Sequence, residues 1–210
     1  MASSVIHIVI ADKVNNVLKR NKKAILIGSI APDISKHLGQ TKEKSHFLDN
    51  VDNNIPNIDK FLSTYKEKLD DDFVLGYYIH LYTDYLWFKY FYPDFVENEY
   101  IYKLDGTKEK VDEEKLIEYF YNDYTNLNIK IIDEYNMDLK IFYESHQEFK
   151  NIINEIPMNK IDLIIEKAGI IIENSKIKKD YAFNFEIVKK FIEDSTDYII
   201  SNLKDIGAIK

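Results

Sequence analysis

The chain has 210 residues and a net charge of −8, and 45% of its residues are hydrophobic. This is enough apolar material for one core, so we expect residues 1–210 to fold as a single domain. Arg20 is the only arginine, which disfavours binding of long nucleic acid because such binding needs a basic surface. Cysteine is absent, so disulfides and thiolate metal ligands are excluded.

The first third of the chain is predicted to contain two helical stretches followed by an irregular one. Ser3 or Ser4 can cap a helix that runs to about Lys19, with apolar residues at helical spacing. Residues 23–35, KAILIGSIAPDIS, form a second apolar stretch. A helix within it is expected to end near Ala31, because Pro32 disfavours helix at the residue before it. Residues 35–56 are polar and are expected to be irregular.

The rest of the chain is also predicted to be mostly helical. Residues 57–69 form one helix, and residues 70–92 form the longest apolar helix, opened by acidic residues that suit a helix N-terminus. Asp105-Gly106 between two extended stretches predicts a small β-hairpin near residues 100–111. Three or four amphipathic helices are expected after it, at about 112–135, 138–153, 160–174 and 184–204. We therefore predict an all-α fold, a compact multi-helix bundle with this one hairpin.

The long apolar helix carries two candidate ligands in the sequence GYYIHLYTD. His80 and Asp84 are four residues apart and therefore lie on one helix face. Gly76 is one turn earlier on that face, where the missing side chain lets a ligand or another backbone approach. An isolated pair of this kind is most often a buried histidine hydrogen-bonded to its helical neighbour, so the pair alone does not establish a metal site.

Three further pieces upstream carry residues of the same chemistry. In GSIAPDIS, Asp33 sits on a turn constrained by proline, where it can ligate a metal, take a proton from water, or simply be a turn aspartate. In KSHFLD, His46 is a possible ligand or a surface histidine, and His7 is a possible ligand or a core histidine. Together the candidates offer the nitrogen and oxygen ligands that zinc accepts, and they are His7, Asp33, His46, His80 and Asp84.

The order of these pieces resembles the zinc-dependent phospholipase C family, which is related in fold to the S1/P1 nucleases. The resemblance covers about residues 4–90 and rests on an early helical histidine, GSIAPDI, SH and GYYIHLYTD. It implies a helical bundle in which a cluster of zinc ions hydrolyses phosphodiesters. By this resemblance one zinc is surrounded by Asp33, His46, His80 and Asp84. Asp84 would also bridge toward a neighbouring metal held by His7, and Asp33 would act as the general base.

The resemblance is incomplete after the HxxxD helix, where the family carries further metal ligands. No histidine lies between Asp84 and His146, so we expect one or two zinc ions rather than three. The other two histidines, His37 and His146, are interpreted as a loop residue and a solvated helix residue. With a single arginine in the chain, metal would have to do most of the phosphate binding.

The leading functional hypothesis is a zinc-dependent hydrolase, phospholipase C-like, that acts on small phosphoester or phospholipid substrates through a metal-activated water. One alternative is a nuclease or nucleotide phosphodiesterase on the same scaffold. Another is a non-enzymatic helical protein whose zinc is structural and closed by four protein ligands.

The sequence also bears on location. The first 13 residues contain an apolar patch without a basic segment before it, and no run has the length needed to cross a bilayer. We therefore expect a cytoplasmic protein without a transmembrane segment, and we make no prediction of its oligomeric state.

Overall fold

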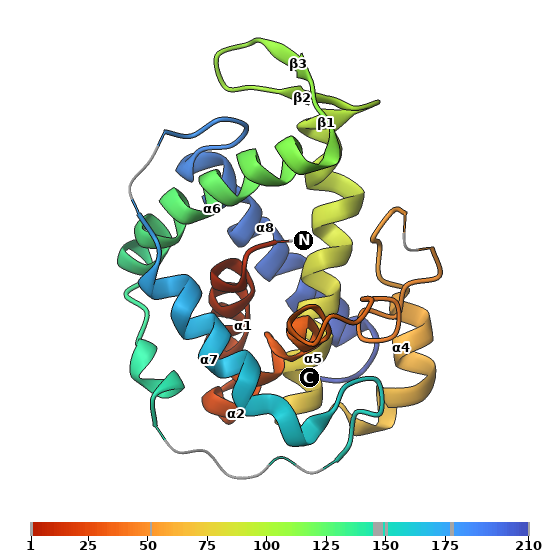
Figure 1. The fold of residues 1–210 in the computed structure, drawn as a ribbon. Helices are drawn as coiled ribbons and strands as arrows, with labels where there is room; N and C mark the ends of the chain where they lie inside the picture. Colours follow the sequence, from red (N-terminus) through yellow and green to blue (C-terminus); the bar gives the residue numbers. More distant parts are fainter. Residues whose placement is uncertain (1, 51, 145–148, 150, 177–178, 210) are drawn as a thin grey trace.

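Helices make up most of the chain in the computed structural model, with one small antiparallel sheet (Figure 1). The structure describes residues 2–50, 52–144, 149, 151–176 and 179–209. The all-α prediction with a small β element is confirmed. Within the described residues no helix is long and apolar enough to cross a bilayer.

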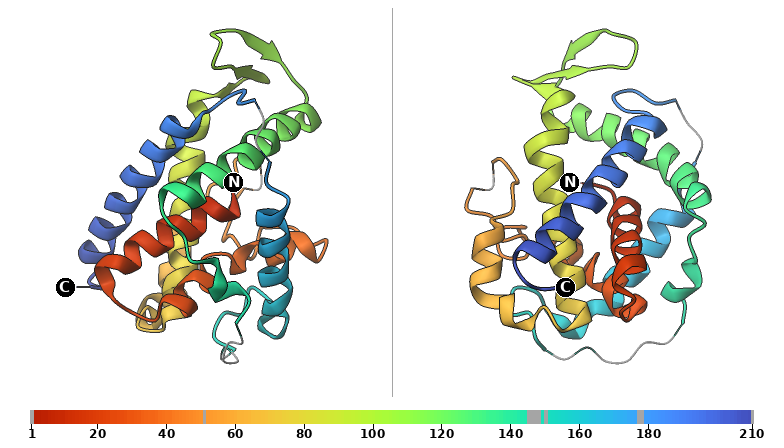
Figure 2. Two further views of the ribbon diagram at one scale, coloured as in Figure 1. Left: turned by 90° about the vertical axis from the view of Figure 1, so that its left-hand side faces the viewer. Right: turned by 180° about the vertical axis from the view of Figure 1, so that it is seen from behind.

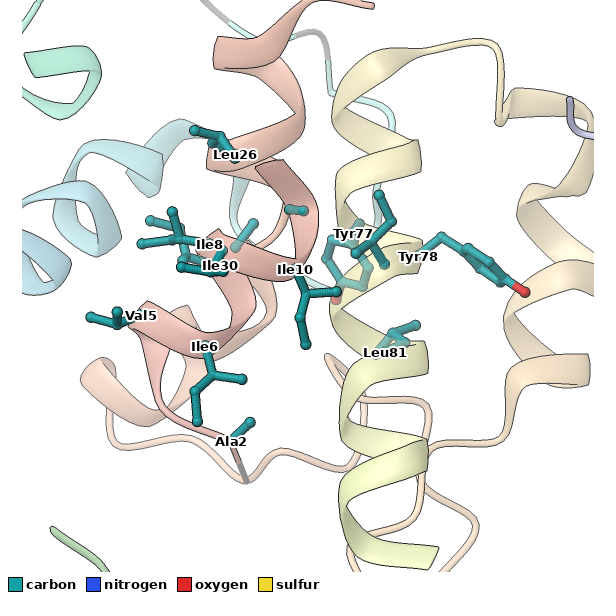
Figure 3. Packing of buried hydrophobic residues seen from close by; sticks show 14 of the residues in the cluster. Ala2, Val5, Ile6, Ile8, Ile10, Leu26, Ile30, Tyr77, Tyr78 and Leu81 are labelled. Atoms are coloured by element: carbon teal, nitrogen blue, oxygen red, sulfur yellow. The ribbon is translucent and has the colours of Figure 1, made fainter. Parts of the chain in front are cut away.

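Two helices, α1 (Ser4–Leu18) and α5 (Asp72–Leu86), form the centre of the molecule. Both are apolar on nearly all faces, which is typical of helices surrounded by protein. α8 (Phe185–Asp205) lies along both of them (Figure 2). Figure 3 shows buried side chains of α1 and α5 in one packed cluster, among them Ile10 and Leu81.

Helix starts follow the capping residues that the sequence offers. Ser3 accepts a hydrogen bond from the backbone N–H of Ile6, as predicted for the first helix. Asp71 caps α5 by accepting hydrogen bonds from two backbone N–H groups of its first turn. α4 (Ile58–Tyr65) begins after Asn57 in the same way and packs against α5.

Helix α5 meets α2 (Lys22–Gly28) backbone to backbone at two glycines. A Cβ atom added to Gly76 would lie 2.1 Å from the carbonyl oxygen of Ile25, and one added to Gly28 would lie 2.3 Å from that of Phe73. The space that Gly76 leaves is therefore filled by another backbone, which was one of the two possibilities raised by the sequence.

The sheet lies at one end of the molecule, beyond the helices (Figure 1). Its strands pair antiparallel in the order β1 (Val96–Glu97), β2 (Tyr100–Tyr102) and β3 (Lys108–Lys110). The predicted hairpin is β2–β3, and Gly106 in its turn has a φ of +81°. Strand β1 was not predicted, because two residues are too short to show an alternating pattern.

The C-terminal half contains α6 (Glu113–Glu134), α7 (Ile161–Glu173) and α8, close to the predicted ranges. The helix predicted at 138–153 is wrong for the part that the structure describes, where only a short 3₁₀ turn occurs at Leu139–Phe142. Phe142 reaches the core from the 3₁₀ turn and Ile153 from irregular chain, so the apolar spacing that suggested an α-helix has another origin. The prediction for His146 lies outside the described residues.

Asp123 of α6 holds the segment that leads into α8. Its buried carboxylate accepts hydrogen bonds from the backbone N–H groups of Tyr181 (2.7 Å), Ala182 (2.9 Å) and Phe183 (3.3 Å). The ring of Phe183 in turn packs edge-on against that of Trp87, which continues from α5. This one carboxylate therefore fixes the 181–183 segment against the aromatic core.

We expect Asp123→Ala to lower the free energy of unfolding by about 2–4 kcal/mol, because buried N–H donors lose a charged acceptor. Urea unfolding followed by circular dichroism measures this. Asp133→Ala, on an exposed position of the same helix, is the matched control and should change stability by less than about 0.5 kcal/mol. Equal stability of the two variants would show that Asp123 does not carry this role.

Candidate metal centre

The structure brings all five candidate ligands together in the interior. His7 comes from α1, Asp33 from the turn after α2, and His46 from the loop before α4. His80 and Asp84 come from one face of α5. All five are buried, and Asp33 is the most exposed of them at 4%. Segments distant in sequence thus place three imidazoles and two carboxylates at one point.

The five residues form two triads that share His80. One triad is His7, His80 and Asp84, and the other is Asp33, His46 and His80. Within each triad the ligand atoms lie within 4.8 Å of one another. Asp84 also reaches toward the second triad, since its Oδ2 lies 3.7 Å from Nε2 of His46. Two buried sites of this composition could each hold a metal ion.

Neighbouring groups set which nitrogen His80 presents to the centre. Its Nδ1 lies 2.7 Å from the carbonyl oxygen of Ser29, and a carbonyl can only accept, so Nδ1 must donate. Nε2 is then left with its lone pair toward the cluster. Main-chain contacts that fix the ring of a histidine in this way are typical of metal ligands. The close approach of α2 at Gly28 puts the Ser29 carbonyl in this position.

His46 is oriented in the same sense by the residue before it. Its Nδ1 lies 2.9 Å from Oγ of Ser45, and that hydroxyl donates to the carbonyl oxygen of Lys42. The Ser45 oxygen is therefore free to accept from Nδ1 of His46. Nε2 of His46 then faces Nε2 of His80 at 3.2 Å. Two lone pairs this close repel each other unless a proton or a metal cation lies between or beside them.

Several polar atoms of the cluster lack partners. Both ring nitrogens of His7, Oδ1 of Asp33 and Oδ2 of Asp84 are buried without a hydrogen bond among the described residues. Oδ1 of Asp84 accepts a hydrogen bond from the backbone N–H of Ala2 at 3.2 Å and also lies 3.3 Å from Nε2 of His7. Leaving buried polar atoms unpaired is costly, so this donor set fits metal ions better than a protein-only network.

The charge state of the cluster also suits a cation. Burial raises the pKa of Asp33, but the adjacent imidazoles of His46, His80 and His7 outweigh it and hold the pKa well below its usual range. The pKa of Asp84 is likewise lowered, by His7 and His80 against burial. Burial and the neighbouring His7 lower the pKa of His80 to about 3. At neutral pH the carboxylates are therefore ionised and His80 is neutral, which are the forms that bind metal.

The sequence did not reveal the groups that orient these ligands. The Ser29 carbonyl and the Ala2 N–H are main-chain groups and have no residue-type signal. Ser45 stands directly before His46 in the SH pair, and its hydroxyl could have been suspected from that position. His37 lies outside both triads and borders the cavity beside Asp33. It was expected in a loop, but it is the last residue of the short helix α3 (Ile34–His37).

A cavity of about 590 Å³ adjoins the centre. Of the five candidate ligands, only Asp33 lines it. The four others are more deeply buried, with 2% exposure or less. A molecule in the cavity would therefore meet the cluster from the side of Asp33.

Comparison of the chain with protein-family models, curated proteins and solved structures finds no match. The function therefore has to be inferred from the side chains of the centre and the cavity beside it.

Proposed function

We propose that the protein is a zinc-dependent hydrolase of phosphoester substrates, similar to phospholipases C. The observation that carries this is the convergence of three buried histidines and two buried aspartates beside an open cavity. Structural zinc sites are usually closed by several cysteines, whereas catalytic ones use histidine and carboxylate and keep a position for water. The donor set of this centre is of the second kind.

The two triads assign the ligands. Because only Nε2 of His80 is free to ligate, His80 would bind one ion, together with Asp33, His46 and Asp84. Asp84, whose Oδ1 lies 3.3 Å from Nε2 of His7, would also contact a second ion held by His7. Zinc bound there would supply a Lewis acid that activates water and neutralises negative charge on a phosphoryl oxygen. Ser29 and Ser45 keep the His80 and His46 rings in the orientation that presents Nε2.

Asp33 is the residue best placed to move a proton. It is ionised, one of its oxygens has no hydrogen-bond partner among the described residues, and it alone of the ligands faces the cavity. Its carboxylate can take the proton of the water that attacks phosphorus. The phosphorus–oxygen bond to the alcohol then breaks, and the departing alkoxide takes a proton from solvent.

The proposal is tested by metal analysis of the purified protein followed by turnover measurements on phosphomonoesters, phosphodiesters and phospholipids. We expect bound zinc and hydrolysis of at least one of these esters. Stoichiometric zinc without hydrolysis of any of them would overturn the enzymatic assignment and favour a structural zinc.

His7 should contribute to metal binding from α1. We expect His7→Ala to lower the zinc content, because one triad loses a nitrogen ligand, whereas His37→Ala should keep it. Chelation of the wild-type protein should lower its unfolding midpoint, since a ligand at 100 times its Kd stabilises the folded state by about 2.7 kcal/mol. This loss should be smaller in His7→Ala. Unchanged zinc content and stability in His7→Ala would remove His7 from the site.

A further inference from the structure

The cavity beside Asp33 has two chemically different sides. Its mouth carries the exposed Lys36 of the short helix α3 (Ile34–His37) and the half-buried Lys42 of the loop before His46. Its other wall is largely apolar and comes from α6 and α7, including Phe120, Tyr121 and Ile170. A volume of about 590 Å³ lies within the range of small-molecule sites.

The two lysines bring positive charge to the cavity. Among the described residues neither forms an ion pair, although the chain carries 36 acidic residues. Lys36 donates to the hydroxyl of Tyr121 and lies 4.9 Å from the centre of that ring, which holds it at the mouth. Of the acidic residues that the structure describes, Asp33 alone lines the cavity. Two cations facing one cavity indicate an anionic ligand.

The single arginine cannot take this role. The guanidinium of Arg20 pairs with Asp72 at 2.6 Å and donates to main-chain carbonyl groups at the start of α5. Recognition of a phosphoryl group by protein cations therefore falls to lysine. Lys36 and Lys42 are the lysines that the structure places next to the metal centre.

The apolar wall includes exposed side chains. Ten large hydrophobic residues are exposed among those that the structure describes, and three of them border this cavity: Ile117 (47%), Tyr121 (47%) and Ile170 (38%). An apolar surface that opens into a cavity, with charged groups at one edge, is the pattern of a site for an amphipathic small molecule.

We propose that this cavity binds the substrate of the hydrolase, and that the substrate is an anionic phosphoester of an apolar alcohol. Lys36 and Lys42 bind the phosphoryl oxygens, and the wall that includes Phe120 and Ile170 binds the alcohol. A headgroup with a quaternary ammonium is disfavoured, because it would meet two lysines and no carboxylate other than Asp33. This inference rests on the proposed function.

Calorimetric titration with phenylphosphonate tests the binding step, since this anion has an apolar ring and a phosphorus–carbon bond that hydrolysis does not cleave. Lys36→Gln and Lys42→Gln should each weaken its binding by about 10-fold, through loss of a charge-assisted contact. Lys44→Gln, an exposed lysine of the same loop that does not line the cavity, should bind like wild type. Wild-type affinity in both mouth variants would overturn the proposal.

The apolar wall is tested with a second pair of variants. Ile170→Ser should weaken phenylphosphonate and leave inorganic phosphate unaffected, whereas Val17→Ser, at an exposed position on α1, should change neither. Phosphocholine should bind more weakly than phenylphosphonate. Two results would refute the assignment of the two sides. One is tighter binding of phosphocholine than of phenylphosphonate, and the other is an equal loss of affinity for phenylphosphonate and inorganic phosphate in Ile170→Ser.

Vesicles distinguish a lipid source of the phosphoester from a soluble one. If the wild-type protein sediments with phosphatidylcholine vesicles that contain phosphatidic acid, and Lys36→Gln and Lys42→Gln do not, the ester is a lipid. If the protein binds phenylphosphonate through these lysines but does not sediment with the vesicles, the ester is soluble.

Zinc content and turnover are measured on the same samples. Hydrolysis with unchanged KM in Lys36→Gln and Lys42→Gln would refute this inference alone. Lysine-dependent binding without hydrolysis of any ester would refute the proposed function alone.

Discussion

Asp33→Asn should lose phosphoester hydrolysis by about two orders of magnitude or more while its zinc content falls little. The substitution keeps an oxygen that can contact the metal but removes the base. Asp33 lies on a turn rather than on α5, and it is the candidate ligand that faces the cavity, so it can meet water and substrate. The remaining ligands, which lie deeper, keep the ion in place.

The comparison with His80→Ala makes this result specific. His80 belongs to both triads, so its loss should remove zinc and activity together. Asp52→Asn, on the exposed loop after His46, is the control for exchanging a carboxylate for an amide. Its zinc content and turnover should match those of the wild type. Zinc per chain and turnover are measured side by side for all three variants. Full activity in Asp33→Asn would show that another group takes the proton.

Local spacing was enough to predict the parts of the site that lie on single elements. The i, i+4 pair His80 and Asp84 shares a face of α5, and Pro32 places Asp33 on a turn, as the sequence indicated. The convergence of His7 and His46 with them came from the family resemblance. It depends on how α1 and a loop pack against α5, which no local pattern encodes.

Other features could not be predicted because they depend on distant partners. Lys42 and Lys44 are two residues apart in one polar loop, yet only Lys42 lines the cavity. The sequence does not show that the guanidinium of Arg20 forms an ion pair with the carboxylate of Asp72. In the region of the failed helix at 138–153, Lys23 of α2 donates to the main-chain carbonyl oxygen of Glu144 at 3.0 Å. Directly after that region, the hydroxyl of Tyr65 accepts from the backbone N–H of Asn154 and donates to the carboxylate of Glu155. These contacts join the region to helices that are distant in sequence.

Gly76→Ala should lower the free energy of unfolding by about 3 kcal/mol or more, because the added methyl group meets a backbone that cannot move alone. Its Cβ would lie 2.1 Å from the Ile25 carbonyl oxygen and 3.0 Å from Cα of Gly28. Relief requires α2 and α5 to separate. That movement withdraws the Ser29 carbonyl from His80, so the variant should also lose zinc at concentrations that saturate the wild type.

Gly169→Ala is the matched control for this prediction, because Gly169 also lies inside a helix, α7. There the added Cβ would meet, among the described residues, the Tyr143 hydroxyl alone, at an ordinary 3.6 Å. Alanine is favoured over glycine in a helix by about 0.5–1 kcal/mol, so this variant should be slightly more stable than the wild type. Urea unfolding and zinc titration of both variants separate the effects. If Gly76→Ala were as stable as Gly169→Ala and kept its zinc, the contact between α2 and α5 would not be what holds the His80 ring in place.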